Sequence, residues 1–218
     1  MHTEPGNTAD SGYRNRIKTS AEKGEKYKRR KQHKHAAELA LVERAFAIIP
    51  QSGSVLDIPC GAGRMTVLLA RKGYDCTGAE VADTMVSITR EVIASEGLSC
   101  PIDKQDIEAM GYPNGHFGTI LCFRLFHHFP NPNVRRRVVT ELCRVAKDYV
   151  AISYLSTFAI TSIKRRIRVA LGGKKSVQHA TSLSEVEGYF REQGFELVKD
   201  FAQMPFIHTL HLAVFRRI

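Results

Sequence analysis

The sequence lacks the cysteine pattern of a disulfide framework or of a zinc site. It has five cysteines, an odd number, and no two of them have CxxC spacing. Most of them stand in apolar runs, where thiols are ordinarily buried. The pattern therefore predicts reduced cysteines in a cytosolic protein, and it predicts no metal site.

Long apolar runs are also missing. No stretch of about 20 uninterrupted apolar residues occurs, so we expect no segment that spans a membrane. Residues 1–12 (MHTEPGNTADSG) are polar and contain no hydrophobic signal segment. These absences favour a cytoplasmic protein, and contact with a membrane would then be peripheral, at its inner face.

Acidic residues are too few to balance the basic ones. Lys and Arg number 32 against 22 Asp and Glu, which gives a formal charge of +10. Such an excess predicts attraction to nucleic acid, to a phosphorylated substrate or to an acidic membrane surface, and says nothing about fold. A chain of 218 residues, 43% of them hydrophobic, suits one domain with its own core.

The chain divides into a basic N-terminal arm over residues 1–34 and one folded domain over residues 35–218, without internal repeats. Helices are predicted at 35–50, 63–73, 82–97, 131–146 and 182–194, and strands at 54–59, 74–81, 100–107, 117–126, 148–155, 195–203 and 207–217. Alternating strands and helices are typical of a parallel sheet with helices on both faces. The last two strands are joined by a short turn, so we expect them to pair antiparallel.

The most informative stretch is "VLDIPCGAGRM" at 55–65, an apolar strand followed by a glycine-rich turn and a helix. Gly61 and Gly63 lack a Cβ, so a ligand can approach the backbone closely. A dinucleotide fingerprint needs a third glycine, and Thr66 stands there instead. Glu80, which closes the second strand, can still accept hydrogen bonds from ribose hydroxyls. The pattern indicates ribose recognition without a pyrophosphate turn, and it disfavours a nicotinamide oxidoreductase.

These motifs resemble those of the class I S-adenosylmethionine-dependent methyltransferases, of the small-molecule type. The quoted parts are "VLDIPCGAGR", Glu80 in "GAEVADTM", Asp106 in "DIEAM" and the strand with two histidines in "FGTILCFRLFHHF". The resemblance implies an α/β, Rossmann-like, doubly wound seven-stranded sheet, mostly parallel with an antiparallel C-terminal hairpin. It implies S-adenosyl-L-methionine as the cofactor. One departure is "VAKDYVAIS", where many relatives carry "PGG" before the fifth strand.

Residue by residue, the resemblance implies a cofactor site. Gly61 and Gly63 would line the methionine portion, Asp57 would organise the turn, and Glu80 would bind the ribose diol. The other cofactor residues that it implies are Pro59, Cys60, Val81, Asp106, Ile107, Phe123 and Arg124.

Candidates for the catalytic residues are fewer, because the cofactor carries the reactivity and a general base is needed only for a protonated, weakly acidic acceptor. His127 and His128 follow the fourth strand, and Tyr154 ends the fifth. Each of these three side chains has a structural alternative, either a hydrogen bond to backbone or packing in the core.

Two basic segments lie outside the quoted motifs, although Tyr27 or Arg30 of the N-terminal one could reach the carboxylate of the cofactor. Residues 156–180 form a predicted lid or insertion that contains Lys164, Arg165, Arg166 and Arg168 and no acidic residue, and Arg30 lies in the N-terminal arm. Basic amphipathic segments suit a membrane surface or an anionic substrate. We expect an anionic small-molecule or lipid-linked acceptor. RNA is the less favoured alternative because few aromatic residues accompany the charges, and a non-catalytic anion-binding module is a further one.

Overall fold

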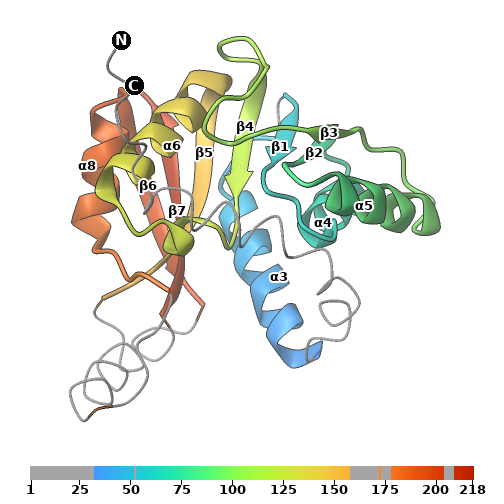
Figure 1. Ribbon diagram of the computed structural model, residues 1–218, viewed down its shortest axis with the longest axis horizontal. Coiled ribbons are helices and arrows are strands. Elements are labelled where there is room, and N and C mark those ends of the chain that lie inside the picture. The colour runs from blue at the N-terminus through green and yellow to red at the C-terminus, as the bar shows by residue number, and fades with distance from the viewer. Residues whose placement is uncertain (1–31, 52, 158–171, 173–177, 204–208) are drawn as a thin grey trace, which may run out of the picture.

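The computed structural model describes residues 32–51, 53–157, 172, 178–203 and 209–218 (Figure 1). Its strands are β1 (Val55–Asp57), β2 (Cys76–Glu80), β3 (Ile102–Lys104), β4 (Phe117–Cys122), β5 (Ala146–Leu155), β6 (Phe195–Ala202) and β7 (Leu210–Arg217). Its helices are α3 (Gln32–Phe46), α4 (Arg64–Arg71), α5 (Asp83–Ser95), the 3-10 turn η2 (Phe126–His128), α6 (Pro132–Val145) and α8 (Leu183–Arg191).

The strands form one seven-stranded sheet in the order β3-β2-β1-β4-β5-β7-β6. The first five positions pair in parallel, and β7 pairs antiparallel with both β5 and β6. The predicted fold class is therefore confirmed, including the closing antiparallel hairpin. Between β1 and β4 the strand order reverses, and in open α/β sheets such a switch point is where ligands bind.

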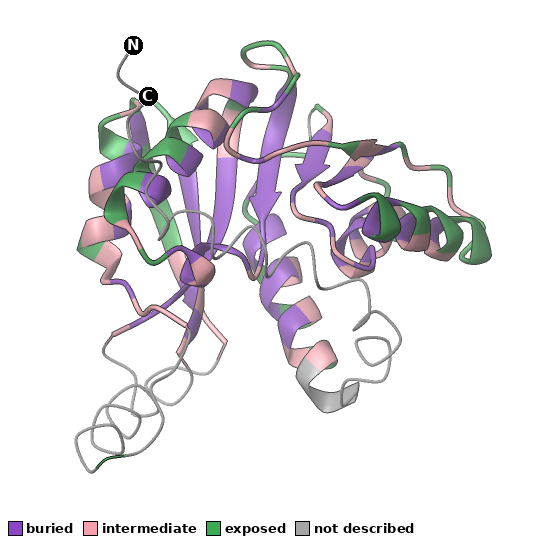
Figure 2. Ribbon diagram, in the orientation of Figure 1, coloured by how far each residue is buried: buried purple, intermediate pink, exposed green. Residues whose placement is uncertain are grey.

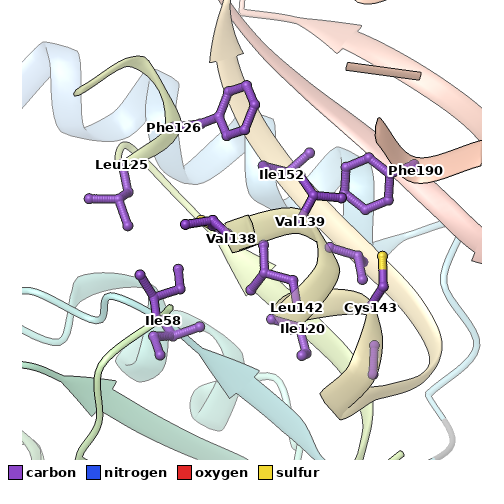
Figure 3. Packing of buried hydrophobic residues seen from close by; sticks show 14 of the residues in the cluster. Ile58, Ile120, Leu125, Phe126, Val138, Val139, Leu142, Cys143, Ile152 and Phe190 are labelled. Atoms are coloured by element: carbon purple, nitrogen blue, oxygen red, sulfur yellow. The ribbon is translucent and has the colours of Figure 1, made fainter. Parts of the chain in front are cut away.

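Two apolar clusters cover the two faces of the sheet because alternate residues of each strand point to opposite sides. Ile120 of β4 belongs to the cluster beneath α6 and α8, whereas the next residue, Leu121, packs with α3 and α4. The first cluster includes Phe190 of α8, whose ring stacks on Phe215 of β7 at a centroid distance of 3.9 Å. Figure 2 shows the buried residues along the strands and on the inward sides of the helices. Figure 3 shows the packing of α6 on the sheet.

Local signals explain where several helices begin. Asn131 accepts a hydrogen bond from the backbone N–H of Asn133 at 2.9 Å, and Pro132 is the first residue of α6. Ser182 accepts one from the N–H of Glu185 at 3.1 Å and caps α8. These side chains satisfy N–H groups that lack a partner inside the helix. At its other end α6 stops at Val145 and β5 begins at the next residue, so no separate turn occupies the place of the family's "PGG".

The fourth strand is shorter than predicted. We expected it to continue to Phe126, but β4 ends at Cys122 and the chain turns into η2. Arg124 has a φ of 66°, in the left-handed region that non-glycine residues rarely adopt. Its N–H donates to Ser153 Oγ of β5 at 2.6 Å instead of continuing the ladder. An apolar run alone could not indicate this stop.

All five cysteines are free, and four of them, all except Cys100, are buried. Within the described residues, no helix combines the length and the apolar character that crossing a bilayer requires.

Candidate functional site

A pocket lies where β1 and β4 end side by side at the switch point of the sheet. It is lined by the turn after β1 and by the residues that follow β4, namely Pro59, Cys60, Gly61, Ala62, Arg64, Met65, Phe123 and Arg124. Five of these eight were predicted to contact a cofactor from the sequence. Ala62, Arg64 and Met65 were not.

The glycine turn presents bare backbone to this pocket. Gly61 has a φ of 55°, and a Cβ built on it would meet no atom within 4 Å. That open space is where a ligand can approach the main chain. Gly63 has a φ of 76°, and a Cβ there would lie 3.0 Å from Thr89 Cγ2 of α5. The first glycine therefore leaves room for a ligand, whereas the second lets α5 pack against the turn.

Thr89 of α5 holds the glycine turn through a contact with the Gly61 backbone. Its buried hydroxyl lies 2.5 Å from the carbonyl oxygen of Gly61, and the Cys60 thiol donates to the same Oγ1 at 3.9 Å. Burial raises the pKa of the Cys60 thiol, and the nearby Asp57 and Glu80 raise it further. Cys60 is therefore a protonated packing residue and not a thiolate nucleophile.

Asp57, at the end of β1, is buried beneath the turn. Its Oδ2 accepts a hydrogen bond from the Thr66 hydroxyl of α4 at 2.7 Å, and its Oδ1 has no partner among the described residues. Burial raises the pKa of the Asp57 carboxyl to about 7, although hydrogen bonds from Thr66 oppose the shift. The Thr66 bond ties the strand to the first turn of the helix that follows the glycines.

Glu80, at the end of β2, binds the backbone of the glycine turn. Its carboxylate accepts hydrogen bonds from the N–H of Gly61 at 3.2 Å and from that of Val81 at 2.9 Å. Burial raises the pKa of this carboxyl, and the backbone N–H bonds counteract the shift. Two carboxylate oxygens offer more lone pairs than these bonds use, so Glu80 can accept further donors from a ligand.

Asp106 and Ile107 follow β3 and line no part of this pocket. The chain just before them is held to β2, because Gln105 N donates to Glu80 O at 3.0 Å. Asp106 Oδ1 accepts from the N–H of Glu108 at 3.0 Å, and Ile107 is buried. The structure therefore places these two residues beyond Glu80, along the same edge of the sheet.

A second charged group was not expected from the sequence. Glu38 of α3 is buried, and its two oxygens lie 3.0 Å from Arg64 Nη2 and 3.3 Å from Arg124 Nη1. One carboxylate thus holds both arginines at the wall of the pocket, one from each side of the switch point. The three charged groups sum to one positive charge beside the turn.

The three predicted catalytic residues lie at the same edge of the sheet, over β4 and β5. His127 is buried in η2, and its ring lies 4.3 Å from that of His128. The main chain of His179 reaches this turn, donating to the carbonyl of His127 at 2.8 Å. Tyr154 is buried, and its hydroxyl donates to Asp200 Oδ2 of β6 at 3.1 Å. None of the three lines the pocket of the glycine turn.

The predicted anion-binding residues Arg30, Lys164, Arg165, Arg166 and Arg168 lie outside the described residues. Within the described part of the chain, no group of three or more His, Cys, Asp or Glu side chains is placed to hold a metal ion.

Sequence reasoning missed four side chains that hold the pocket residues in place: Thr66 of α4, directly after the turn, and Glu38, Thr89 and Ser153 of other elements. Thr66 carried a signal, because it stands one helical turn after the glycines, at the position where a third glycine was sought. Glu38 and Thr89 sit on helical faces among many similar residues. Only the packing of α3 and α5 identifies them.

Comparison with known proteins agrees with this geometry. Residues 55–149 match the family model described as a methyltransferase domain. The ubiquinone biosynthesis O-methyltransferase of Bordetella avium is 26% identical to this chain. The aligned part covers 67% of this chain and 63% of that protein. A 2-heptyl-1-hydroxyquinolin-4(1H)-one methyltransferase of Mycobacteroides abscessus is 34% identical over 36% of this chain and 35% of its own length. The chain thus spans less than two thirds of these curated relatives.

Among solved structures, the magnesium protoporphyrin IX methyltransferase of Synechocystis PCC 6803 with bound S-adenosylmethionine has the same fold. It superposes with a TM-score of 0.71 over 99% of this chain and all of its own, at 14% identity. The family match covers β1 through the start of β5, which is the part that builds the glycine turn, Glu80 and the end of β4. Residues 55–149 therefore resemble a methyltransferase domain, and the chain shares the fold of a solved methyltransferase with bound S-adenosylmethionine.

Proposed function

We propose that this protein transfers a methyl group from S-adenosylmethionine to a hydroxyl oxygen of a small acceptor molecule. The observation that carries the proposal is the turn at Gly61, which is open to a pocket on one side and held by the Glu80 carboxylate on the other. This arrangement offers a close backbone approach and a ribose acceptor at one place.

The residues present fit that cofactor. Its ribose has two adjacent hydroxyls, and Glu80 is a carboxylate with lone pairs to accept them. Its amino acid end has a carboxylate, and Arg64 and Arg124 supply guanidinium donors at the pocket wall. Gly61 leaves space beside the main chain. Asp106 and Ile107 stay our predicted contacts for the adenine.

The bound cofactor would supply an electrophilic methyl group on a sulfonium ion. The residues of this chain then have three tasks: to hold the reactants in line, to exclude water and to accept the acceptor's proton where it has one. Phe123, buried at the end of β4, gives the pocket an apolar wall that keeps water out.

The names of two curated relatives support oxygen as the acceptor atom. One is an O-methyltransferase of ubiquinone biosynthesis, and the other acts on a hydroxyquinolinone. We extend to this chain the chemical class that they share, a small molecule with a hydroxyl group. The formal charge of +10 supports an anionic or lipid-linked form of such a molecule, which a protein in the cytoplasm could meet at a membrane surface.

Two measurements test the proposal. Calorimetry with S-adenosylhomocysteine should show binding to the folded chain, and its absence would remove the cofactor assignment. Labelled S-adenosylmethionine is then incubated with fractionated cell extract and the protein. Label in base-stable, ether-linked small molecules supports methylation of a hydroxyl, whereas base-labile label, which marks a carboxyl methyl ester, or label confined to RNA or protein contradicts it.

A further inference from the structure

Arg124 has an unfavourable backbone conformation at the wall of the pocket. Within the described residues it is the only residue other than glycine with a positive φ, at 66°. A side chain in this left-handed region crowds its own backbone, so surrounding contacts must hold the conformation. Such strain is found most often at binding sites and active sites. Arg124 lines the pocket of the glycine turn, so here the strain falls at the predicted binding site.

Ser153 of β5 holds this conformation from the neighbouring strand. β4 and β5 pair in parallel as far as Cys122 and Ile152, where their ladder ends (Figure 1). Beyond that point the N–H of Arg124 donates to Ser153 Oγ at 2.6 Å. Ser153 is buried, so water cannot readily replace this bond. A side-chain oxygen therefore takes the place of the backbone acceptor that a longer strand would supply.

The sheet places Ser153 on the same side as the pocket. Side chains alternate between the two faces of a sheet, so Ala151 and Leu155, two residues to either side, share a face with Ser153. Both belong to the apolar cluster of α3 and α4. Phe123 and Met65 of the pocket wall belong to that cluster as well. Ser153 therefore supports the pocket wall from the face on which the pocket lies.

The guanidinium of Arg124 keeps donors for a ligand. Its only ion pair within the described residues is the one between Nη1 and Glu38 Oε1, at 3.3 Å. By contrast, Arg64 donates a hydrogen bond to the other oxygen of Glu38 at 3.0 Å. The side chain of Arg124 is 27% exposed. A guanidinium has five N–H donors in a planar fork that suits a carboxylate, so Arg124 can bind one without giving up Glu38.

We propose that Ser153 is a positioning residue of the cofactor site: it holds Arg124 in the left-handed conformation in which the guanidinium binds the carboxylate of the cofactor's amino acid end. A guanidinium that is fixed before the ligand arrives binds it more tightly, because less freedom is lost on binding. The inference rests on the proposed use of S-adenosylmethionine. It goes beyond that proposal because it assigns a role in binding to a residue of β5 that does not line the pocket.

The first experiment compares two ligands by calorimetry. S-adenosylhomocysteine and 5′-methylthioadenosine share the adenosine and the sulfur, but only the first has the amino acid end. For S-adenosylhomocysteine, binding should weaken about 3- to 10-fold in Ser153→Ala and about 10- to 100-fold in Arg124→Ala. The affinity for 5′-methylthioadenosine should stay the same in both variants, which a general loss of structure would not allow. Ser87→Ala, at an exposed serine of α5, is the matched control.

The second experiment separates the backbone of Arg124 from its side chain. Glycine adopts a left-handed φ without the crowding of a Cβ. Arg124→Gly should therefore unfold at a temperature about 2–6 °C above that of Arg124→Ala. Both variants lack the guanidinium and should bind S-adenosylhomocysteine equally weakly. When Ser153→Ala is added to Arg124→Gly, no further affinity should be lost, because the serine acts through the arginine.

The outcomes separate this inference from the proposed function. If the wild-type protein binds neither ligand, the proposed cofactor is wrong. If it binds both, and Ser153→Ala weakens both equally or neither, Ser153 does not position a group for the amino acid end. A loss from Ser153→Ala that is as large in Arg124→Gly as in the wild type would also overturn the inference. Should Ser153→Ala not fold, equal unfolding temperatures of Arg124→Gly and Arg124→Ala would overturn it, because no strain would then be held at this position.

Discussion

At the scale of single residues, the buried carboxyl of Asp57 dominates the electrostatics beneath the glycine turn. Its pKa is about 7 in the folded protein against an ordinary value of 3.8, because burial disfavours the charged form. A carboxyl whose pKa is raised by folding binds its proton more tightly in the folded state. Its contribution to stability is therefore lost as the pH rises between those two values.

Asp57→Asn should remove that pH dependence. The amide oxygen still accepts the Thr66 hydroxyl, but no charge needs to be buried. We expect the wild-type free energy of unfolding to fall by a few kcal/mol more than that of the variant between about pH 4 and pH 8. Urea unfolding across this range measures it, with the exposed Asp75→Asn as the control. Parallel curves for wild type and Asp57→Asn would contradict the assignment.

Glu80 allows a prediction about the ligand. Glu80→Ala removes the acceptor of the ribose hydroxyls and frees the N–H of Gly61. Charge-assisted hydrogen bonds contribute about 1.5–3 kcal/mol, so S-adenosylhomocysteine should bind about 10- to 100-fold more weakly by calorimetry. Glu91→Ala, an exposed carboxylate on α5, is the matched control. Unchanged affinity in Glu80→Ala would show that the ribose binds elsewhere.

Whether a site residue could be predicted from the sequence depends on how far away in the chain its contacts lie. Asp57, Gly61, Gly63 and Glu80 could be predicted because strand, turn and helix follow one another along the chain and leave a local pattern. The pairing of Arg64 with Glu38 joins residues 26 positions apart, and the hydrogen bond from the Arg124 N–H to Ser153 Oγ joins residues 29 positions apart. No local pattern encodes such contacts, so the structure was needed to find them.

At the scale of elements, α3 packs on the sheet and also holds two side chains of the pocket in place. Its apolar side, including Leu41, Val42 and Phe46, packs with the sheet and α4. Glu38 on the same helix holds the two arginines at the pocket. The apolar spacing predicted this helix, but nothing in that spacing singled out Glu38.

Glu38→Gln should therefore affect binding and stability together. The amide cannot balance two guanidinium charges, so Arg64 and Arg124 would repel each other and leave their present positions. We expect a loss of about 1–3 kcal/mol in the free energy of unfolding, and weaker binding of S-adenosylhomocysteine. Calorimetry and urea unfolding measure the two effects.

Glu43→Gln is the control on the same helix. Glu43 pairs with Lys72 at 3.0 Å where both side chains are exposed, and such pairs contribute little. A variant of Glu43 as damaging as that of Glu38 would mean that α3 is sensitive to any lost charge.

The boundaries of elements were harder to predict than their order. The run "FGTILCFRLF" is apolar throughout, and its hydrophobicity cannot reveal that Arg124 adopts a left-handed conformation. That conformation is stabilised by Ser153 of another strand. Tertiary contacts therefore decided where β4 ends, and with it the shape of the pocket wall.

At the scale of the whole molecule, the excess of positive charge favours acidic surfaces. If the acceptor is met at a membrane, the protein should sediment with vesicles of acidic phospholipid and not with neutral ones. Raising the salt concentration to about 0.5 M should release it, because the range of electrostatic attraction then falls below about 5 Å. Equal binding to neutral vesicles, or no binding to acidic ones, would argue for an acceptor free in solution.

The position of β7 has a consequence for how the protein is made. This strand lies between β5 and β6 and pairs with both, although both precede it in the chain. While the ribosome is still synthesising residues 210–217, β5 and β6 have no neighbour on the sides that face each other in the finished sheet. β6 can therefore join the sheet only after β7 has left the exit tunnel, whereas β1 to β5 can pair earlier because β5 also pairs with β4.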